Sequence, residues 1–281
     1  MRVIEPSQLK RRSIKKKKKP VVPILLMLLF AGISLYIWKN VLPKKIDNKK
    51  TTIVNTSSEI KADTIAQKTK LKEFSNTEFV KFYSTFAYPN TSEILTAPVI
   101  TGNAEADKRI QSLAEERGYR LRSAPIVQPV SVVDGYLIQQ KAQKPLTDLL
   151  AEAKKLGMTI TLTAAFRSVD EQRELFLSRL VAKPTDIANG NADTSVNETL
   201  KVTAPPGYSR HHNGFTIDIA CGDVGGIALL QTNCYSWLSK DNFKNAKEYG
   251  WIPSYPEGAS SVGPEPEPWE FVWVGRDALL E

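Results

Sequence analysis

The two histidines of the chain stand side by side in the stretch GYSRHHNGFTIDIA, which covers residues 207–220. His211 lies seven positions before Asp218, a spacing that does not fall on one face of a helix. A turn followed by Gly214 and a strand could instead bring the imidazole and the carboxylate to one point. Two interpretations remain open on spacing alone: a metal site built on this pair, or a solvated turn that Asp218 merely caps.

Two other groups have side chains suited to peptide chemistry. Arg167 follows a β-branched segment and precedes a helix start, and its planar guanidinium can bind a carboxylate or an oxyanion. Glu267 and Glu270 stand three residues apart just before the last apolar run, and could supply a metal ligand and a general base. The alternatives are a surface ion pair of Arg167 with a nearby acid and an exposed acidic turn.

The elements that must position these residues are short and of mixed type. Helical spacing and end signals predict helices within residues 103–119, 145–157, 168–180 and 235–250. Alternating or β-branched runs predict strands at 158–166, 215–220 and 269–275. The polar segment 181–206 is expected to be a surface excursion. Because helices and strands do not alternate regularly, we predict an α+β fold with a small mixed sheet and flanking helices.

The excess positive charge of the chain lies at its N-terminus. The 281 residues carry a net charge of +8, and residues 1–19 contribute nine basic side chains and one acidic side chain. The rest of the chain therefore has 29 basic and 29 acidic residues and no net charge. Binding to nucleic acid needs a basic face on the folded part, so that class of function is disfavoured.

An uncharged run of 19 residues, from Pro20 to Trp38, follows the basic tail. As a helix it would span roughly 28 Å, close to the hydrocarbon core of a bilayer. No small-residue cleavage site follows the run, so a retained transmembrane helix is favoured over a cleaved signal peptide. The basic flank predicts a cytoplasmic N-terminus. We therefore expect a tail (1–19), a transmembrane helix (20–38), a linker (39–75) and an extracytoplasmic domain (76–281).

The two cysteines of the chain, Cys221 and Cys234, are separated by 13 positions in the part expected outside the membrane. In an oxidising compartment such a pair indicates a disulfide. Free thiols and metal ligation are the alternatives, although no CxxC-like partner supports a zinc site on these cysteines.

Taken in their order along the chain, the segments that carry these residues resemble the VanY-type D-alanyl-D-alanine carboxypeptidase family. These are zinc peptidases that include L,D-carboxypeptidases and VanX-type dipeptidases. The family motif Ser-x-His-x-x-Gly-x-Ala-x-Asp is matched by residues 209–218, with Thr216 in the alanine position. The other matching blocks are Phe166-Arg167-Ser168 with Gln172, Trp237-Leu238, Tyr249-Gly250-Trp251, Tyr255-Pro256, and Glu267-Pro268-Trp269-Glu270 through Trp273-Val274-Gly275. The resemblance covers roughly residues 140–276.

The resemblance implies a function and a role for each matching residue. His211 and Asp218 would bind zinc, and Glu267 would be the general base for metal-activated water. Arg167 would polarise the scissile carbonyl and stabilise the oxyanion. Substrate binding would involve the side chains of Ser209 and Gln172. The expected reaction is removal of the C-terminal D-alanine from peptidoglycan stem peptides, with D,D and L,D specificity both open.

Glu270 departs from the family pattern, because it occupies the position of the third zinc ligand, a histidine. A carboxylate can bind zinc at about 2.0–2.2 Å, so a site of His211, Asp218 and Glu270 is chemically possible. Two anionic ligands would leave a neutral centre that activates water less, and another divalent metal such as manganese could replace zinc. His212 is not expected to be a ligand, because adjacent residues of a turn point apart. The alternative function is a weak or inactive relative that binds cell-wall peptides.

Overall fold

The structure is a computed structural model that describes residues 70–129, 131–258 and 263–281. The expected basic tail, the transmembrane helix at 20–38 and most of the expected linker lie outside these residues. Among the described residues, the helices are all too short or too polar to cross a membrane.

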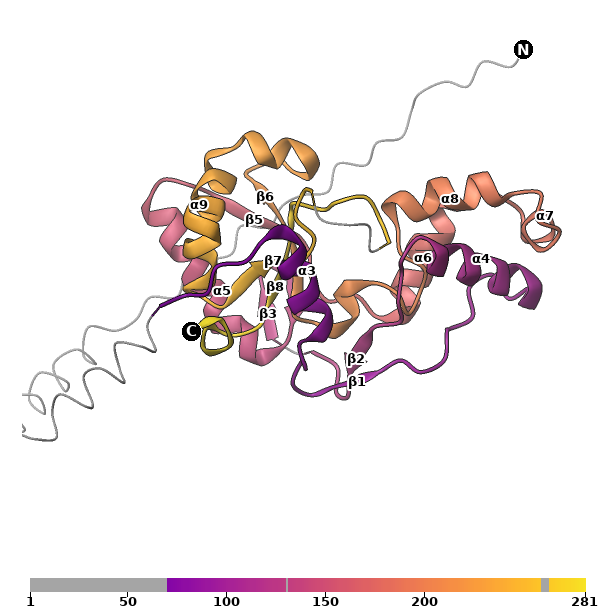
Figure 1. The fold of residues 1–281 in the computed structure, drawn as a ribbon, viewed down its shortest axis with the longest axis horizontal. Coiled ribbons are helices and arrows are strands. Elements are labelled where there is room, and N and C mark those ends of the chain that lie inside the picture. The colour runs from indigo at the N-terminus through magenta and orange to yellow at the C-terminus, as the bar shows by residue number, and fades with distance from the viewer. Residues whose placement is uncertain (1–69, 130, 259–262) are drawn as a thin grey trace, which may run out of the picture. The chain divides into compact units, whose positions relative to one another are not determined.

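Helices and short strands follow each other irregularly in the described chain, in agreement with the α+β class (Figure 1). The α-helices are α3 (Asn76–Thr85), α4 (Ala104–Glu116), α5 (Gln140–Lys155), α6 (Val169–Arg179), α7 (Pro184–Ala188), α8 (Asp193–Val202) and α9 (Asn233–Lys247). The strands are β1 (Thr91–Glu93), β2 (Ser123–Pro125), β3 (Ser131–Val133), β4 (Tyr136–Ile138), β5 (Ile160–Ala164), β6 (Thr216–Cys221), β7 (Trp251–Pro253) and β8 (Glu270–Trp273). Short 3₁₀ helices are η2 (Arg210–Asn213), η3 (Gly226–Gln231) and η4 (Arg276–Leu279).

A four-stranded sheet in the order β5-β6-β8-β7 carries Asp218 on β6 and Glu270 on β8. All of its pairings are antiparallel, so the expectation of a mixed sheet is wrong. The reason is connectivity: β7 and β8 are consecutive strands that pair with each other, and β8 then pairs with β6 in the opposite direction. The register of β6 and β8 places Asp218 opposite Glu270. Residues directly opposite in such a pair project from the same face of the sheet.

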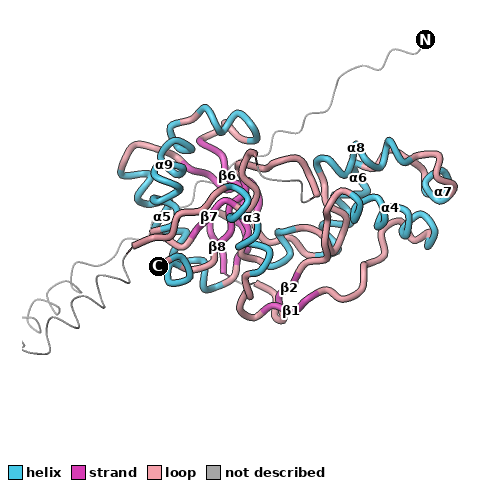
Figure 2. Tube along the Cα trace, viewed as in Figure 1, coloured by secondary structure: helices cyan, strands magenta, loops and turns pink. Residues whose placement is uncertain are grey.

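Two hydrophobic clusters stabilise the described fold. The larger one lies between the sheet and helices α3, α5 and α9, and includes the fully buried Trp251. The smaller one is formed by α4, α6, α7 and α8, which gather away from the sheet (Figure 2). Ile187, Val196 and Leu200 of this cluster have no exposed area, so residues 181–206 are not the expected surface excursion. These three side chains are buried where α7 and α8 contact α4, whereas Val181 and Val202 of the same segment are exposed.

Helix α5 begins earlier than its proline suggests. The sequence predicts a start at Pro145, but the helix starts at Gln140 and contains Pro145 in its interior. The proline removes one N–H donor near the start of the helix. Burial of a continuous face, which includes Ala142 and Leu146, outweighs that loss. The capping box predicted for α6 is present, because the Ser168 hydroxyl accepts from the Glu171 backbone and the Glu171 carboxylate accepts from Ser168.

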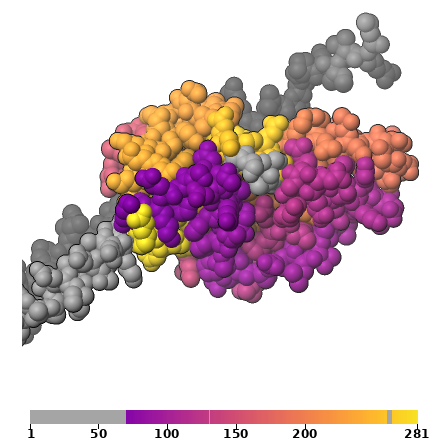
Figure 3. Space-filling view, viewed as in Figure 1, coloured from indigo at the N-terminus to yellow at the C-terminus, as the bar shows by residue number. Residues whose placement is uncertain are grey.

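The segment 70–75 was expected to be the end of the linker but belongs to the folded part. Leu71 forms a β-bridge with Leu280, and the Lys72 N–H donates to the Leu279 carbonyl over 2.9 Å. The space-filling view shows the first described residues and the C-terminal residues side by side (Figure 3). The body of the domain therefore starts before residue 76.

Cys221 and Cys234 are joined in a disulfide, the pairing expected from the sequence, with their Cα atoms 5.8 Å apart. The bridge links the end of β6 to the first turn of α9. It therefore fastens the strand that carries Asp218 to a helix of the main hydrophobic cluster.

Candidate metal centre

A single turn of 3₁₀ helix, η2, positions His211. The Ser209 hydroxyl caps the turn by accepting from the His211 N–H over 3.3 Å. Gly214 ends it with φ of +75°, a left-handed conformation that glycine adopts without strain. The His211 Nδ1–H donates to the Ala165 carbonyl over 2.8 Å. This contact fixes the tautomer and leaves the unprotonated Nε2 free to act as a ligand.

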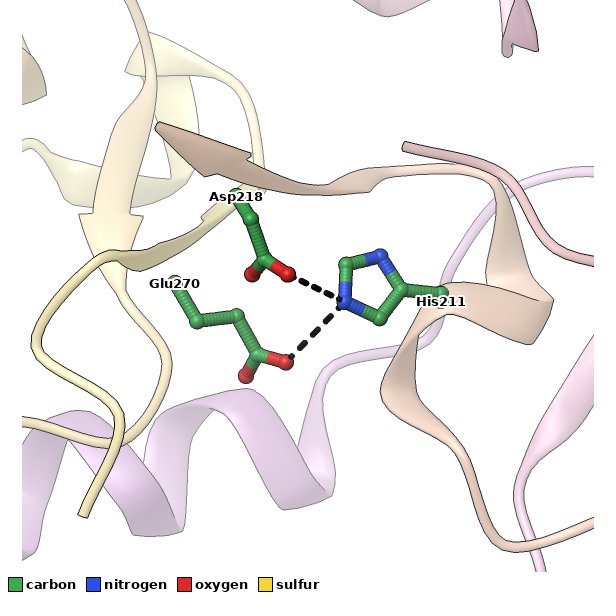
Figure 4. A group of neighbouring side chains, drawn as sticks. All are labelled: His211, Asp218 and Glu270. Atoms are coloured by element: carbon green, nitrogen blue, oxygen red, sulfur yellow. Dashed lines mark ion pairs between the residues drawn. The ribbon is translucent and has the colours of Figure 1, made fainter. Parts of the chain in front are cut away.

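Asp218 from β6 and Glu270 from β8 face the Nε2 atom of His211 (Figure 4). Nε2 lies 3.4 Å from Asp218 Oδ2 and 3.5 Å from Glu270 Oε2. One potential ligand atom from each of the three residues lies within 4.8 Å of the other two. The sequence-predicted ligand set, drawn from a turn and two strands, is therefore brought together at one point.

The geometry of this cluster fits a divalent metal ion. Distances of 3.4 and 3.5 Å are too long for good hydrogen bonds to a protonated imidazole. They match the separation of about 3.4 Å between two ligands that each lie about 2.1 Å from a tetrahedral zinc ion. In addition, Asp218 Oδ1 is buried without a hydrogen-bond partner among the described residues. One imidazole and two carboxylates form a donor set that zinc accepts.

The electrostatic surroundings of His211 favour a cation at its free nitrogen. Burial by itself lowers the pKa of His211, but the charges of Asp218 and Glu270 outweigh it, so the pKa is raised. A positive charge at Nε2, whether from a proton or from a metal ion, therefore interacts favourably with both carboxylates. A metal ion would bind there in competition with the proton.

Glu267 lies beside the three candidate ligands, in the loop before β8. Its backbone N–H donates to the Tyr255 carbonyl over 3.1 Å, and Arg210 Nη1 donates to its Oε2 over 3.3 Å. Burial, followed by the charge of Glu270, raises the pKa of Glu267 to about 8 in the metal-free protein. A divalent cation nearby would favour the ionised form and lower that pKa toward neutrality.

Arg167, Gln172 and Ser209 line the same cavity of about 190 Å³ as the cluster. Arg167 Nη1 donates to Gln172 Oε1 over 2.7 Å, and Gln172 Nε2 donates to the Ala204 carbonyl over 2.7 Å. Glu171, a candidate for a surface ion pair with Arg167, instead caps α6. The arginine therefore faces the cavity, with its position set by Gln172.

His212 points away from the cluster, as expected. Its Nδ1–H donates to the Arg167 carbonyl over 2.7 Å, and its Nε2 accepts from the Gly207 N–H over 3.0 Å. Burial lowers the pKa of His212 to about 4, so the ring is neutral at pH 7. Its position indicates a structural role, in which it joins the loop of Arg167 to the turn of His211.

Several residues at the site were not identified from the sequence. Arg210 Nη1 donates to Glu270 Oε1 over 3.2 Å as well as to Glu267, and the Ser254 hydroxyl donates to the same Glu270 oxygen. The Arg210 guanidinium lies 4.7 Å from the centre of the Tyr255 ring and 5.6 Å from that of Tyr83. The position of Arg210 next to His211 was the one available signal. Nothing in the local sequence marks Tyr83, which comes from α3.

A family model described as VanY, D-alanyl-D-alanine carboxypeptidase, matches residues 135–276, just over half of the chain. The chain therefore belongs to the VanY family of D-alanyl-D-alanine carboxypeptidases, and the resemblance drawn from the sequence is confirmed. Helices α3 and α4 and strands β1, β2 and β3 precede the matched region.

Individual relatives are similar over part of their length. The putative carboxypeptidase YodJ of Bacillus subtilis (strain 168) is 27% identical over 145 residues, which are 50% of this chain and 48% of that protein. The chain thus spans about half the length of this curated relative. A vancomycin-resistance D,D-pentapeptidase VanY variant solved with Zn(II) is 23% identical, with a TM-score of 0.43 over 54% of this chain and 82% of that one. The LD-carboxypeptidase LdcB is 25% identical, with a TM-score of 0.42 over 53% and 65%.

Proposed function

We propose that the protein is a metal-dependent carboxypeptidase that removes the C-terminal D-alanine from peptidoglycan stem peptides. Membership of the VanY family supports the reaction class. The observation that carries the proposal is the convergence of His211, Asp218 and Glu270 on one point, next to Glu267 and Arg167 in one cavity. These residues provide a metal site, a base and a cation, the three components of a metallopeptidase.

Each side chain of the site has its own role in the proposed reaction. Zinc or another divalent ion held by the cluster supplies Lewis-acid chemistry at the scissile carbonyl. Glu267 accepts a proton from the attacking water, whose oxygen bonds to the carbonyl carbon, and returns the proton to the leaving amine as the C–N bond breaks. Arg167 stabilises the negative charge that develops on the carbonyl oxygen. Ser209 and Gln172 orient the peptide in the cavity.

Incubation with defined stem peptides tests this function. The purified protein is incubated with a pentapeptide ending in D-alanyl-D-alanine or with a tetrapeptide with a single terminal D-alanine, with and without added zinc. The products are identified by mass spectrometry. Metal-dependent loss of one alanine from the pentapeptide indicates D,D specificity, and loss from the tetrapeptide indicates L,D specificity. If the metal-loaded protein releases alanine from neither peptide, the proposed activity is wrong.

The second candidate is a relative that binds stem peptides without cleaving them. The contacts of Arg210 with both Glu267 and Glu270 favour it, because they partly neutralise the candidate base and a candidate ligand. Calorimetry with the same peptides separates the two functions. Binding without alanine release supports the second candidate, whereas release in the presence of metal supports the first.

We also propose that residues 20–38 anchor the chain in the cell membrane with the catalytic domain outside. The support is the uncharged run of 19 residues behind a basic tail, together with a substrate class that lies outside the membrane. Protease treatment of intact cells from which the wall has been removed tests the topology. Digestion of the C-terminal domain is expected, and complete protection would contradict it.

A further inference from the structure

The two oxygens of Glu270 have different surroundings. Oε2 faces His211 Nε2 at 3.5 Å, whereas Oε1 accepts hydrogen bonds from Arg210 Nη1 and Ser254 Oγ. The side chain is 3% exposed, so water does not compete freely for either oxygen. A carboxylate can bind a metal through one oxygen or through both. The contacts of Glu270 leave only Oε2 available.

Arg210 is buried beside Glu270, and its Nη1 atom donates to both glutamates of the site. Its side chain is 4% exposed and lies over the rings of Tyr255 and Tyr83, both in the range of cation–π contacts. A buried guanidinium is stable only when it is paired, and the acidic partners of Arg210 are Glu267 and Glu270. Tyr83 belongs to α3, outside the region matched by the family model. Helix α3 therefore helps to position the Arg210 guanidinium, which in turn binds Glu270.

We infer that Arg210 is a positioning residue that binds Oε1 of Glu270 and presents Oε2 alone to the metal. This inference rests on the proposed function, because it takes Glu270 as a ligand. The formal charges agree with it: Arg210 and Glu270 together carry no net charge, as does the neutral histidine that the resemblance places at position 270. The Arg210–Glu270 pair thus takes the place of a neutral histidine that would bind through one nitrogen. Glu270 binds through one oxygen, and Arg210 neutralises its charge.

Cobalt substitution tests the inference, because the visible spectrum of bound Co²⁺ reports its coordination number and geometry. Four forms of the full chain are compared: the unmodified protein, Arg210→Met, Glu270→His, and the double variant. In Arg210→Met, Oε1 loses its cationic partner and keeps only the neutral Ser254 hydroxyl, which competes less well with a divalent ion. Glu270 can then bind through both oxygens, so the cobalt absorption should lose intensity and shift. In the Glu270→His background, Arg210→Met should leave the spectrum unchanged, because an imidazole nitrogen is a single donor.

Arg122→Met is the matched control for the loss of a nearby positive charge. The Arg122 guanidinium lies 5.4 Å from the centre of the same Tyr83 ring and lines the same cavity. Among the described residues, however, the ion pairs of Glu270 are with Arg210 and His211. The cobalt spectrum of Arg122→Met should therefore match that of the unmodified protein.

The possible outcomes are distinct. An unchanged spectrum in Arg210→Met, or equal changes in both backgrounds, overturns the positioning role while leaving the metal site in place. Failure of the unmodified protein to bind cobalt or zinc overturns both the inference and the proposed function. If Arg210→Met does not fold, the crystal structure of the zinc-loaded unmodified protein decides. Arg210 on Oε1 with Oε2 alone on the metal supports the inference, and Glu270 bound through both oxygens overturns it.

Discussion

Replacing His212 by Gln should make the stability of the protein less sensitive to acid. The His212 ring is 1% exposed and accepts from the Gly207 N–H, so it folds in its neutral form. Burial lowers the pKa of His212 to about 4, compared with 6.5 for a free histidine. Between these pH values the unfolded chain binds a proton that the folded chain does not bind. The free energy of unfolding therefore falls as the pH falls through this window.

The size of this effect on the free energy of unfolding follows from the shift in the pKa of His212. One pKa unit corresponds to about 1.4 kcal/mol, so the contribution of His212, fully present above pH 6.5, amounts to roughly 3 kcal/mol and is lost by about pH 4. At pH 7, His212→Gln should be the less stable protein, because Gln cannot make both hydrogen bonds of the ring. That difference should shrink by roughly 3 kcal/mol as the pH falls to 4.

Urea unfolding of both metal-free proteins, followed by tryptophan fluorescence between pH 4 and 7, measures this difference directly. Carboxylates and His211 titrate in both proteins, so their contributions largely cancel in the comparison. A stability difference that stays constant from pH 7 to 4 would refute the neutral, buried state of His212.

Other substitutions test the remaining roles. Glu267→Gln should keep the metal and lower kcat by roughly 10²–10⁴-fold, measured by alanine release; a fully active variant would exclude Glu267 as the base. Asp218→Asn should lose stoichiometric zinc on dialysis, measured by elemental analysis, and an unchanged zinc content would contradict its role as a ligand. Replacing Cys221 and Cys234 by Ser should lower the free energy of unfolding by roughly 3 kcal/mol in urea titrations, because the bridge spans 13 positions; no loss would mean that the disulfide does not constrain the unfolded chain.

Local patterns predicted those parts of the fold that local physics determines. The capping box at Ser168 and Glu171 is present because two side chains close in sequence satisfy two backbone donors at a helix start. The strand around Asp218 was predictable from alternation of polar and apolar residues. The pairing of Asp218 with Glu270 was not, because strand register depends on residues far apart in the chain. The expected grouping of His211, Asp218 and Glu270 came instead from the ordered family motifs.

Features that depend on distant contacts were missed. Segment 181–206 is too polar to predict helices, yet Ile187 and Val196 bury themselves against α4, which lies far upstream. Arg210 gave no sign of a role at the metal site, because its importance depends on Glu270, Ser254 and two aromatic rings from other elements. A charged residue beside a ligand is usually solvated. Only the three-dimensional arrangement shows that Arg210 is buried and bound to Glu270, a candidate metal ligand.

The central claim is that His211, Asp218 and Glu270 bind one metal ion. X-ray diffraction from zinc-loaded crystals, recorded on both sides of the zinc absorption edge, tests it most directly. The account predicts one strong anomalous peak within about 2.0–2.2 Å of His211 Nε2, an Asp218 oxygen and Glu270 Oε2. A peak at another position, or zinc bound without Glu270, would contradict the account.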